Sequence, residues 1–217
     1  EYLYSLRDKQ YNSFIELLDD IKGVVNSSQL NILIELDYFS EFGKSQKLMD
    51  IVELYNTIYT KKQFKKDNLP CDIEVMRKYA TTETDKMFKD VDKQGLCKHL
   101  ENIIDDVDLP IQQRIKSWIE NTGSCNLIDN TQSKKNAIVI DINTKYKTPK
   151  IKLYNLNSGK TAEVKIGSKL WSEYKLDLFD TITIVRTKPK FKKNKIDNKW
   201  VETDEREFWL EDYIICK

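Results

Sequence analysis

The chain has 217 residues, 40% of them hydrophobic and 11% aromatic, which is enough for one large or two small packed domains and excludes a globally disordered protein. Lys and Arg number 36 against 35 Asp and Glu, and the net charge of +1 by itself points to no class of partner. No apolar run approaches the ~18 residues of a membrane-spanning helix, so we expect a cytoplasmic protein without membrane contact.

Apolar residues in the first half of the chain recur at helical spacing, and they predict an all-helical domain over residues 1–125. Phe14, Leu17, Leu18 and Ile21 form the first stripe, and Gly23 is a typical residue for ending a helix. Further helices are expected at 27–36, 45–59, 73–79, 96–107 and 111–121, with Ser27 or Ser28 and then Ser45 as N-caps.

The composition changes after the last expected helix, because residues 122–135 are rich in Asn, Ser, Thr and Gly. We assign 126–135 as a linker. Beyond it the hydrophobic period becomes two, with many β-branched and aromatic residues, and this pattern predicts strands. The expected strands are 136–145, 150–156, 160–166, 181–191 and 205–215, with a short helix at 168–174 and a basic loop at 192–198.

Three strands, a helix and two more strands are the element order of the OB-fold, a small five-stranded β-barrel. We therefore expect an α+β protein in which an OB-fold domain over 136–217 follows the helical domain. In that fold single-stranded nucleic acid lies on the second and third strands, between the first-to-second and the fourth-to-fifth loops.

Lysines gather in this expected domain, where residues 145–195 carry 14 Lys and Arg against 4 Asp and Glu, a net charge of +10. Such a local excess is typical of a surface that binds nucleic acid, although a solvated loop is the alternative for the lysines at 192–195. Aromatic residues interleave with the cations; Phe191 is the best stacking candidate, whereas Tyr154 and Trp209 fit a core position equally well. The candidate DNA-binding residues are Lys145, Tyr146, Lys147, Lys150, Lys152, Tyr154, Arg186, Lys188, Lys190, Phe191, Lys192, Lys193 and Lys195.

A break between two expected helices at 37–43 is a second candidate site. A helix N-terminus there can direct backbone N–H groups at a duplex phosphate, with Gly43, Lys44 and Ser45 as the contacts. An ordinary packing joint between two helices is the alternative. Elsewhere, the segment TDKMF at 84–88 resembles in part the peptides that dock on sliding clamps, although it lacks their usual Gln.

Catalytic chemistry finds little support in the sequence. The four cysteines are dispersed and His99 is the only histidine, so neither a zinc site nor a Ser-His-Asp triad is expected. The carboxylate pairs at 19–20 and 105–106 lie on expected helices, where neighbouring side chains diverge. We therefore expect no catalytic residue, no metal and no cofactor.

Two parts of the chain resemble the bacterial DNA polymerase III alpha subunits, the family C replicative polymerases. VNSSQLNILIELDYFSEFG at 25–43 resembles the start of their helix-hairpin-helix region, which would span about 26–60 here, although Asp37 stands where the family turn has Gly. The segments 141–166 and 207–215 resemble the OB region of Firmicute and phage members. The residues that match in the hairpin are Asn26, Leu30, Leu33, Ile34, Phe39 and Gly43.

The resemblance implies that the hairpin contacts duplex DNA and that the OB domain contacts single-stranded template during replication. The catalytic aspartates of the polymerase palm are absent, so we expect no polymerase activity from this chain alone. The chain begins at Glu1 without a methionine, and we expect it to be part of a longer polymerase or a remnant of one. The alternative function is a non-catalytic scaffold that docks on a sliding clamp or a polymerase core.

Overall fold

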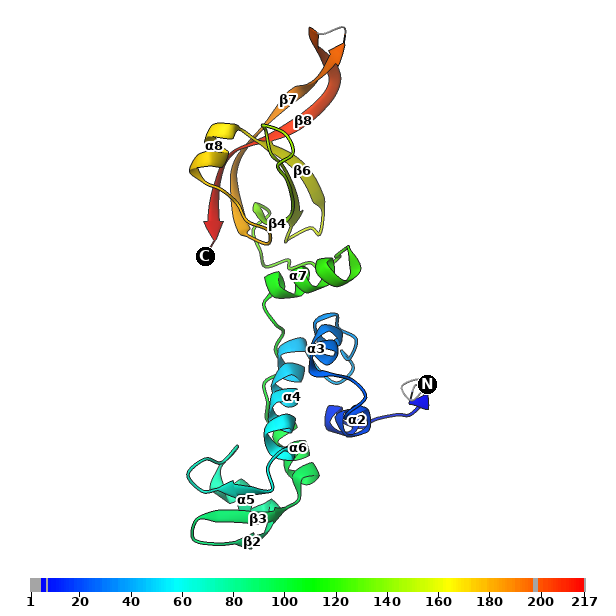
Figure 1. Ribbon diagram of the computed structural model, residues 1–217, viewed down its shortest axis with the longest axis vertical. Helices are drawn as coiled ribbons and strands as arrows, with labels where there is room; N and C mark the ends of the chain where they lie inside the picture. The colour runs from blue at the N-terminus through cyan, green and yellow to red at the C-terminus, as the bar shows by residue number, and fades with distance from the viewer. Residues whose placement is uncertain (1–4, 7, 197–198, 217) are drawn as a thin grey trace. The chain divides into compact units, whose positions relative to one another are not determined.

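A computed structural model describes residues 5–6, 8–196 and 199–216, and the chain divides into two compact units between Leu109 and Pro110. The first unit is mainly helical, and the second contains a five-stranded mixed sheet that closes into a ring (Figure 1). This arrangement confirms the α+β class. The division leaves the helix at 111–122 with the second unit rather than with the helices before it.

The helices of the first unit follow the apolar spacing of the sequence. Helix α3 begins after Asn26, whose side chain accepts a hydrogen bond from the Gln29 N–H while the Gln29 side chain returns one to Asn26, so the cap is Asn26 rather than Ser27 or Ser28. Helix α6 begins at Lys93, three residues earlier than expected, because Asp92 caps it. It ends at Glu101, six residues before the expected end at 107, so the expectation that the carboxylate pair at 105–106 lies on a helix is wrong. The bounds are α2 Phe14–Ile21, α3 Ser27–Glu35, α4 Ser45–Tyr59, α5 Ile73–Tyr79 and α6 Lys93–Glu101.

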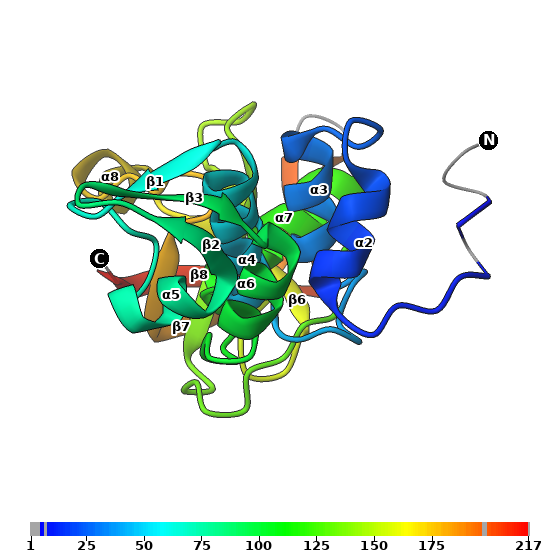
Figure 2. The ribbon, with the colours of Figure 1, turned by 90° about the horizontal axis from the view of Figure 1, so that it is seen from below.

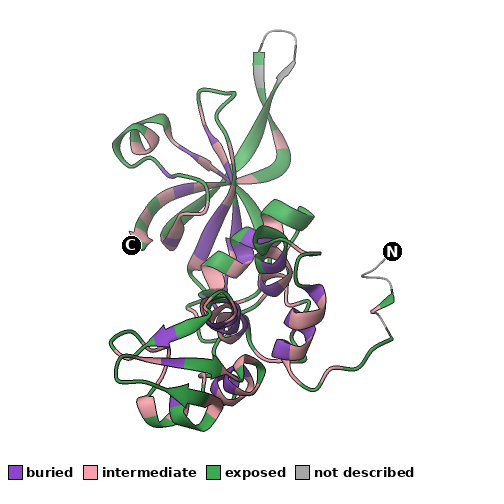
Figure 3. Ribbon diagram, turned by 60° about the horizontal axis from the view of Figure 1, so that its bottom comes forward, coloured by how far each residue is buried: buried purple, intermediate pink, exposed green. Residues whose placement is uncertain are grey.

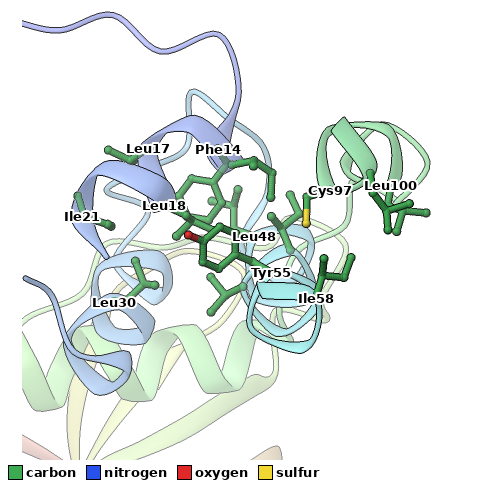
Figure 4. Packing of buried hydrophobic residues seen from close by; sticks show 14 of the residues in the cluster. Phe14, Leu17, Leu18, Ile21, Leu30, Leu48, Tyr55, Ile58, Cys97 and Leu100 are labelled. Atoms are coloured by element: carbon green, nitrogen blue, oxygen red, sulfur yellow. The ribbon is translucent and has the colours of Figure 1, made fainter. Parts of the chain in front are cut away.

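The core of the first unit lies between α2, α4 and α6. Phe14, Leu18 and Tyr55 point toward one another there (Figure 4), and the side chain of Leu48 is 1% exposed. The Tyr55 hydroxyl reaches the edge of this core and donates a 2.7 Å hydrogen bond to Asp19. Burial and this carboxylate raise the pKa of Tyr55, so the phenol stays protonated and keeps donating.

Three short strands make the expectation of an all-helical first domain wrong. Strands β1 (Gln63–Lys65), β2 (Ala80–Glu83) and β3 (Met87–Val91) form an antiparallel sheet in the order β1-β3-β2 (Figure 2). Phe64 and Phe88 are register partners on its buried face, at 1% and 0% exposure. Because Phe88 is a core residue in a paired strand, the segment at 84–88 is not a free clamp-docking peptide.

A buried carboxylate ties α6 to the start of α2. Glu101 is 7% exposed, and its Oε1 accepts a 2.9 Å hydrogen bond from the backbone N–H of Phe14. Burial raises the pKa of Glu101, although backbone hydrogen bonds from Phe14 and Ile15 oppose the shift. The carboxylate therefore satisfies N–H groups that the first turn of α2 would otherwise leave without partners.

The variant Glu101→Ala should lower the free energy of unfolding by about 1–3 kcal/mol, because it leaves buried N–H groups without an acceptor. Urea denaturation followed by far-UV circular dichroism measures this loss. Glu101→Gln keeps an acceptor oxygen and should cost clearly less. Equal losses in the two variants would mean that the charge, and not the hydrogen-bond acceptor, stabilises the start of α2.

The second unit is built on the ring, whose strand order is β4-β5-β6-β8-β7 with β7 also paired to β4. All neighbours are antiparallel except β6 and β8, which are parallel. Alternate residues such as Val139, Leu153 and Leu210 fill the interior of the ring. The bounds are α7 Ile111–Thr122, β4 Asn136–Asn143, β5 Lys150–Asn155, β6 Thr161–Ile166, α8 Ser168–Glu173, β7 Thr181–Ile196 and β8 Lys199–Cys216.

Helix α7 covers part of the outer side of the ring. Its buried Ile115 packs with Ile138 of β4 and with Tyr154 of β5, so these two strands are buried on both faces near that helix. The Tyr154 hydroxyl donates a 2.6 Å hydrogen bond to the carbonyl of Leu127. Toward β6 the outward residues Glu163 and Lys165 are exposed and half-buried, respectively.

Strands β7 and β8 continue beyond the ring as a two-stranded arm, which we define as residues 189–196 and 199–207 (Figure 1). The expected basic loop at 192–198 is therefore wrong over residues 192–196, which belong to β7. The described arm residues are almost all exposed (Figure 3). In the arm, β7 and β8 are hydrogen-bonded to each other and to no further strand. Pairs of side chains across the two strands must therefore hold the register.

Candidate nucleic-acid interface

The N-terminus of α4, the second candidate site, is occupied by the chain itself. The Lys44 N–H donates a 2.8 Å hydrogen bond to Asp106, and the Ser45 N–H and hydroxyl both donate to Asp108. The carbonyl of Val107 accepts from the next two amides of the helix. The chain itself occupies the N–H groups of Lys44 and Ser45, so the structure does not support the expected contact of Gly43, Lys44 and Ser45 with duplex DNA and favours the packing joint.

Two backbone positions shape this joint. Asp37 has a φ of +59°, the left-handed conformation that a glycine adopts more readily, where α3 ends. Gly43 has a φ of +144°, and a side chain there would meet the Asp106 carboxylate at 3.1 Å. Because Gly43 has no side chain, the acidic segment at 106–108 can lie close to the N-terminus of α4.

The open face of the ring carries a row of cations that crosses four strands. Lys150 of β5 is the register partner of Lys165 of β6, which is paired with Trp209 of β8, which in turn is paired with Lys188 of β7. Residues next to them in sequence, such as Ile151, point into the ring, so these four side chains point outward. We name this set the cationic row.

Trp209 stands at the centre of the cationic row, surrounded by charged groups. The Lys190 Nζ lies 3.7 Å from the centroid of its ring and the Lys165 Nζ lies 5.8 Å away, both within cation–π range. The indole N–H donates a 2.9 Å hydrogen bond to Glu207. The indole is thus fixed in orientation, with cations beside it.

Glu207 links the indole to the lysine in front of it. Its Oε2 lies 2.5 Å from the Lys165 Nζ, and its Oε1 accepts from Trp209. Partial burial opposes ionisation, but the hydrogen bonds from Lys165 and Trp209 lower the pKa of Glu207 overall. An ionised Glu207 at neutral pH therefore holds both neighbours in place.

More of the expected DNA-binding residues lie around the cationic row. Lys152 is exposed on β5, two residues from Lys150, and is the register partner of Glu163. The connection from β4 to β5 carries Tyr146, which is 62% exposed, and the exposed residues Lys145 and Lys147. In the described part of the chain no ion-pair partner is found for Lys145, Lys147, Lys152, Lys188 or Lys190.

Three other expected cations lie against carboxylates of β8. Lys192 pairs with Glu205 at 2.8 Å, Lys193 with Glu202 at 3.1 Å, and Arg186 with Glu211 at 3.3 Å. The hydrogen bond that Lys192 donates to Glu205 raises the pKa of Lys192, as expected of a cation beside a carboxylate. Lys150 of the cationic row likewise pairs with Glu163 of β6, at 2.8 Å. Much of the positive charge counted along the sequence is therefore offset by carboxylates on neighbouring strands.

Two of the expected aromatic contacts are placed differently. Tyr154 is 1% exposed beneath α7, so the expectation that it stacks on a base is wrong. Phe191 is 48% exposed, but it is on the face of the arm opposite Lys190 and Trp209 and cannot share a base with them. The side chain of Lys195 lies outside the described part of the chain.

Lys165 is not among the residues expected from the sequence, and the sequence fits Trp209 equally well to a core position and to a binding site. In the sequence, Lys165 occupies a position typical of any solvent-facing residue of a strand. Trp209 occupies a position that a core aromatic residue of a strand could equally take. Only the parallel register of β6 and β8 brings the two together. A parallel pairing between residues 44 positions apart leaves no local signal in the sequence.

Comparisons with protein-family models, with curated proteins and with solved structures find no match to this chain. Among the described residues, no cluster of three or more His, Cys, Asp or Glu side chains could hold a metal ion. None of the helices in the same residues is long and apolar enough to cross a membrane.

Proposed function

We propose that this chain binds single-stranded DNA, without catalysis, on the outer face of β5, β6, β8 and β7. The observation that carries the proposal is the cationic row: Lys150, Lys165 and Lys188 lie in one line across the sheet with Trp209 between them. Single-strand binding needs cations that track phosphates and flat rings that accept bases, and this face offers both.

The mechanism divides the work between the lysines and the indole. Backbone phosphates lie against Lys150, Lys188 and the cations of the 144–149 connection, and they release counterions as they bind. A base stacks on Trp209 as the flexible Lys190 side chain moves from the ring to a phosphate. Since stacking and charge are tolerant of base identity, we expect little sequence preference.

The fold supports this proposal. The order β4-β5-β6-β8-β7, the parallel pair β6 and β8, and the helix α8 between the third and fourth strands are the arrangement expected of an OB-fold barrel. We assign the ring to that fold, and the arm then takes the place of its fourth-to-fifth loop. The row lies between the 144–149 connection and the arm, the position in which OB-folds hold single strands.

The resemblance to the DNA polymerase III alpha subunits names the biological setting of the proposal. In that setting the chain holds single-stranded template beside a replicative polymerase. The hairpin contributes packing and not duplex contact, because acidic residues of the same unit occupy the N-terminus of α4. The choice of DNA over RNA rests on the resemblance alone.

The variant Trp209→Leu tests the proposal directly. It should weaken binding of fluorescein-labelled dT12 about tenfold, because it removes a stacking surface and keeps an apolar side chain at the site. Fluorescence anisotropy at several salt concentrations measures both the affinity and its salt dependence. The salt dependence should stay unchanged, since no charge is removed.

The control is Tyr174→Leu, which removes a 56% exposed aromatic ring outside the cationic row. The affinity of this control should equal that of the unaltered chain. Failure of the unaltered chain to bind dT12 at low salt would refute the proposal and favour the scaffold function, in which a clamp or polymerase core is retained instead.

A further inference from the structure

A cleft opens where the arm leaves the ring. Strands β6 and β8 pair only from Val164 with Phe208 to Ile166 with Leu210, and before those residues the two strands diverge. The space between them has a volume of about 320 Å³. This lies near the lower end of the ~300–1,000 Å³ typical of small-ligand sites, a size that suits one nucleotide-sized group.

An aromatic side chain lines this cleft from the arm side. Phe208 and Trp209 are neighbours in β8, so their side chains point to opposite faces of the strand. Phe208 points to the same side as the buried Leu210, but it lies beyond the filled interior of the ring and is 50% exposed. The cleft therefore offers a second aromatic ring, on the face of β8 opposite to Trp209.

Cations from the arm surround the same cleft. Lys192, Lys193 and Arg206 all line it, and Arg206 has its guanidinium 5.6 Å from the centroid of the Phe191 ring. The two lysines pair with Glu205 and Glu202, whose side chains are 71% and 59% exposed. Exposed pairs of this kind contribute little stability, so a phosphate can replace either carboxylate at small cost.

The cleft is continuous with the cationic row. Lys150 and Lys165 belong to the row and also line the cleft, so a single strand can pass from the row into the cleft along these two residues. Glu163 and Glu207 lie between them, but each is held by one of these lysines, at 2.8 Å and 2.5 Å. These two pairs are neutral in sum, but five cations and three carboxylates line the whole cleft, so its lining keeps a net charge of +2.

We propose that the cleft binds a second nucleotide of the same single strand, with its base on Phe208 and its phosphate between the arm cations. This inference rests on the proposed function and extends it, because the strand would turn around β8 from the row into the cleft. The footprint of the chain is then longer than the cationic row alone. Phe208 and Trp209, adjacent in sequence, hold different nucleotides.

The test compares two oligonucleotide lengths, dT4 and dT12, by fluorescence anisotropy on the full chain. The row spans three strand spacings of ~4.8 Å, which a four-nucleotide strand covers, whereas a twelve-nucleotide strand can also enter the cleft. Phe208→Leu should weaken dT12 binding about fivefold or more and leave dT4 binding within twofold. Trp209→Leu should weaken both.

Controls separate stacking from folding and from charge. Tyr174→Leu removes another half-exposed ring and should change neither affinity. The urea midpoint of Phe208→Leu should match that of the unaltered chain. Arg206→Gln should lower the salt slope of dT12 binding by about 0.7, the value for one phosphate contact with a single strand, and leave the dT4 slope unchanged.

Each remaining outcome has a distinct meaning. If Phe208→Leu changes dT12 binding by less than twofold, or weakens both lengths equally, the cleft inference is overturned while the effect of Trp209→Leu still supports the proposed function. If the unaltered chain binds neither oligonucleotide, both proposals fall. If a labelled twelve-residue polyglutamate peptide binds and Phe208→Leu abolishes that binding, the cleft takes an acidic polypeptide and the inference is overturned.

Discussion

Reversal of charge at Lys188 and Lys190 should weaken the binding of dT12 about 100-fold near physiological salt. Each lysine is exposed beside Trp209, and neither has an ion-pair partner in the described part of the chain. The variant Lys188→Glu, Lys190→Glu removes two phosphate contacts and adds two repulsive charges, so the loss should exceed that of neutral substitutions. Affinity measured by anisotropy at four or more salt concentrations gives both the loss and the slope.

The salt slope distinguishes this effect from misfolding. Loss of two contacts to a single strand lowers the slope of log K against log salt by about 1.4, whereas a partly unfolded sample keeps its slope and loses active fraction. The matched control is Lys169→Glu, Lys175→Glu, which changes the net charge equally at exposed positions outside the row. Equal weakening by the control would show that net charge, and not the row, governs binding.

The variant Phe88→Ala should destabilise the first unit by about 3–5 kcal/mol. Phe88 is fully buried in β3 opposite Phe64, and truncation leaves a cavity that the three short strands cannot close. The loss is a large share of the ~5–15 kcal/mol by which a typical domain is stable, so the thermal midpoint should fall by more than ~10 °C. Urea denaturation and the thermal midpoint by circular dichroism measure it.

A neighbouring position supplies the control for this prediction. Lys89 follows Phe88 in β3 and points away from the core, so Lys89→Ala should change the free energy of unfolding by less than about 0.5 kcal/mol. If Phe88→Ala were as mild as Lys89→Ala, the segment at 84–88 would not be part of a packed sheet. A docking peptide for a clamp would then become the better interpretation.

The sequence predicts the helices of the first unit well, because their stability comes from local apolar stripes. The spacing of Leu48, Ile51 and Tyr55 is sufficient to place α4 at 45–59, and the structure confirms it. The three-stranded sheet escapes prediction, since strands of three to five residues show too few alternations for a period to emerge. Phe64 and Phe88 stabilise this sheet by packing as a cross-strand pair between β1 and β3, which are distant in the sequence.

The candidate site is predicted in part. The strand order and the basic residues Lys150, Lys152, Lys188 and Lys190 follow from pattern and composition, and the structure places them on or beside one outer face. The hairpin contacts at 43–45 are not predictable from spacing, because their amides are taken by Asp106 and Asp108, some sixty residues away. A local sequence motif does not indicate which distant carboxylate will accept hydrogen bonds from its backbone amides.

The sequence by itself determined the α+β class, the positions of the main helices and the presence of a lysine-rich strand region. It did not determine where the positive charge is effective, because six carboxylates at 202–212 come just after the window with a net charge of +10. Antiparallel pairing folds these acids back against Arg186, Lys192 and Lys193. Only the tertiary structure decided which lysines stay free beside Trp209, since electrostatic interaction depends on distance in space and not along the chain.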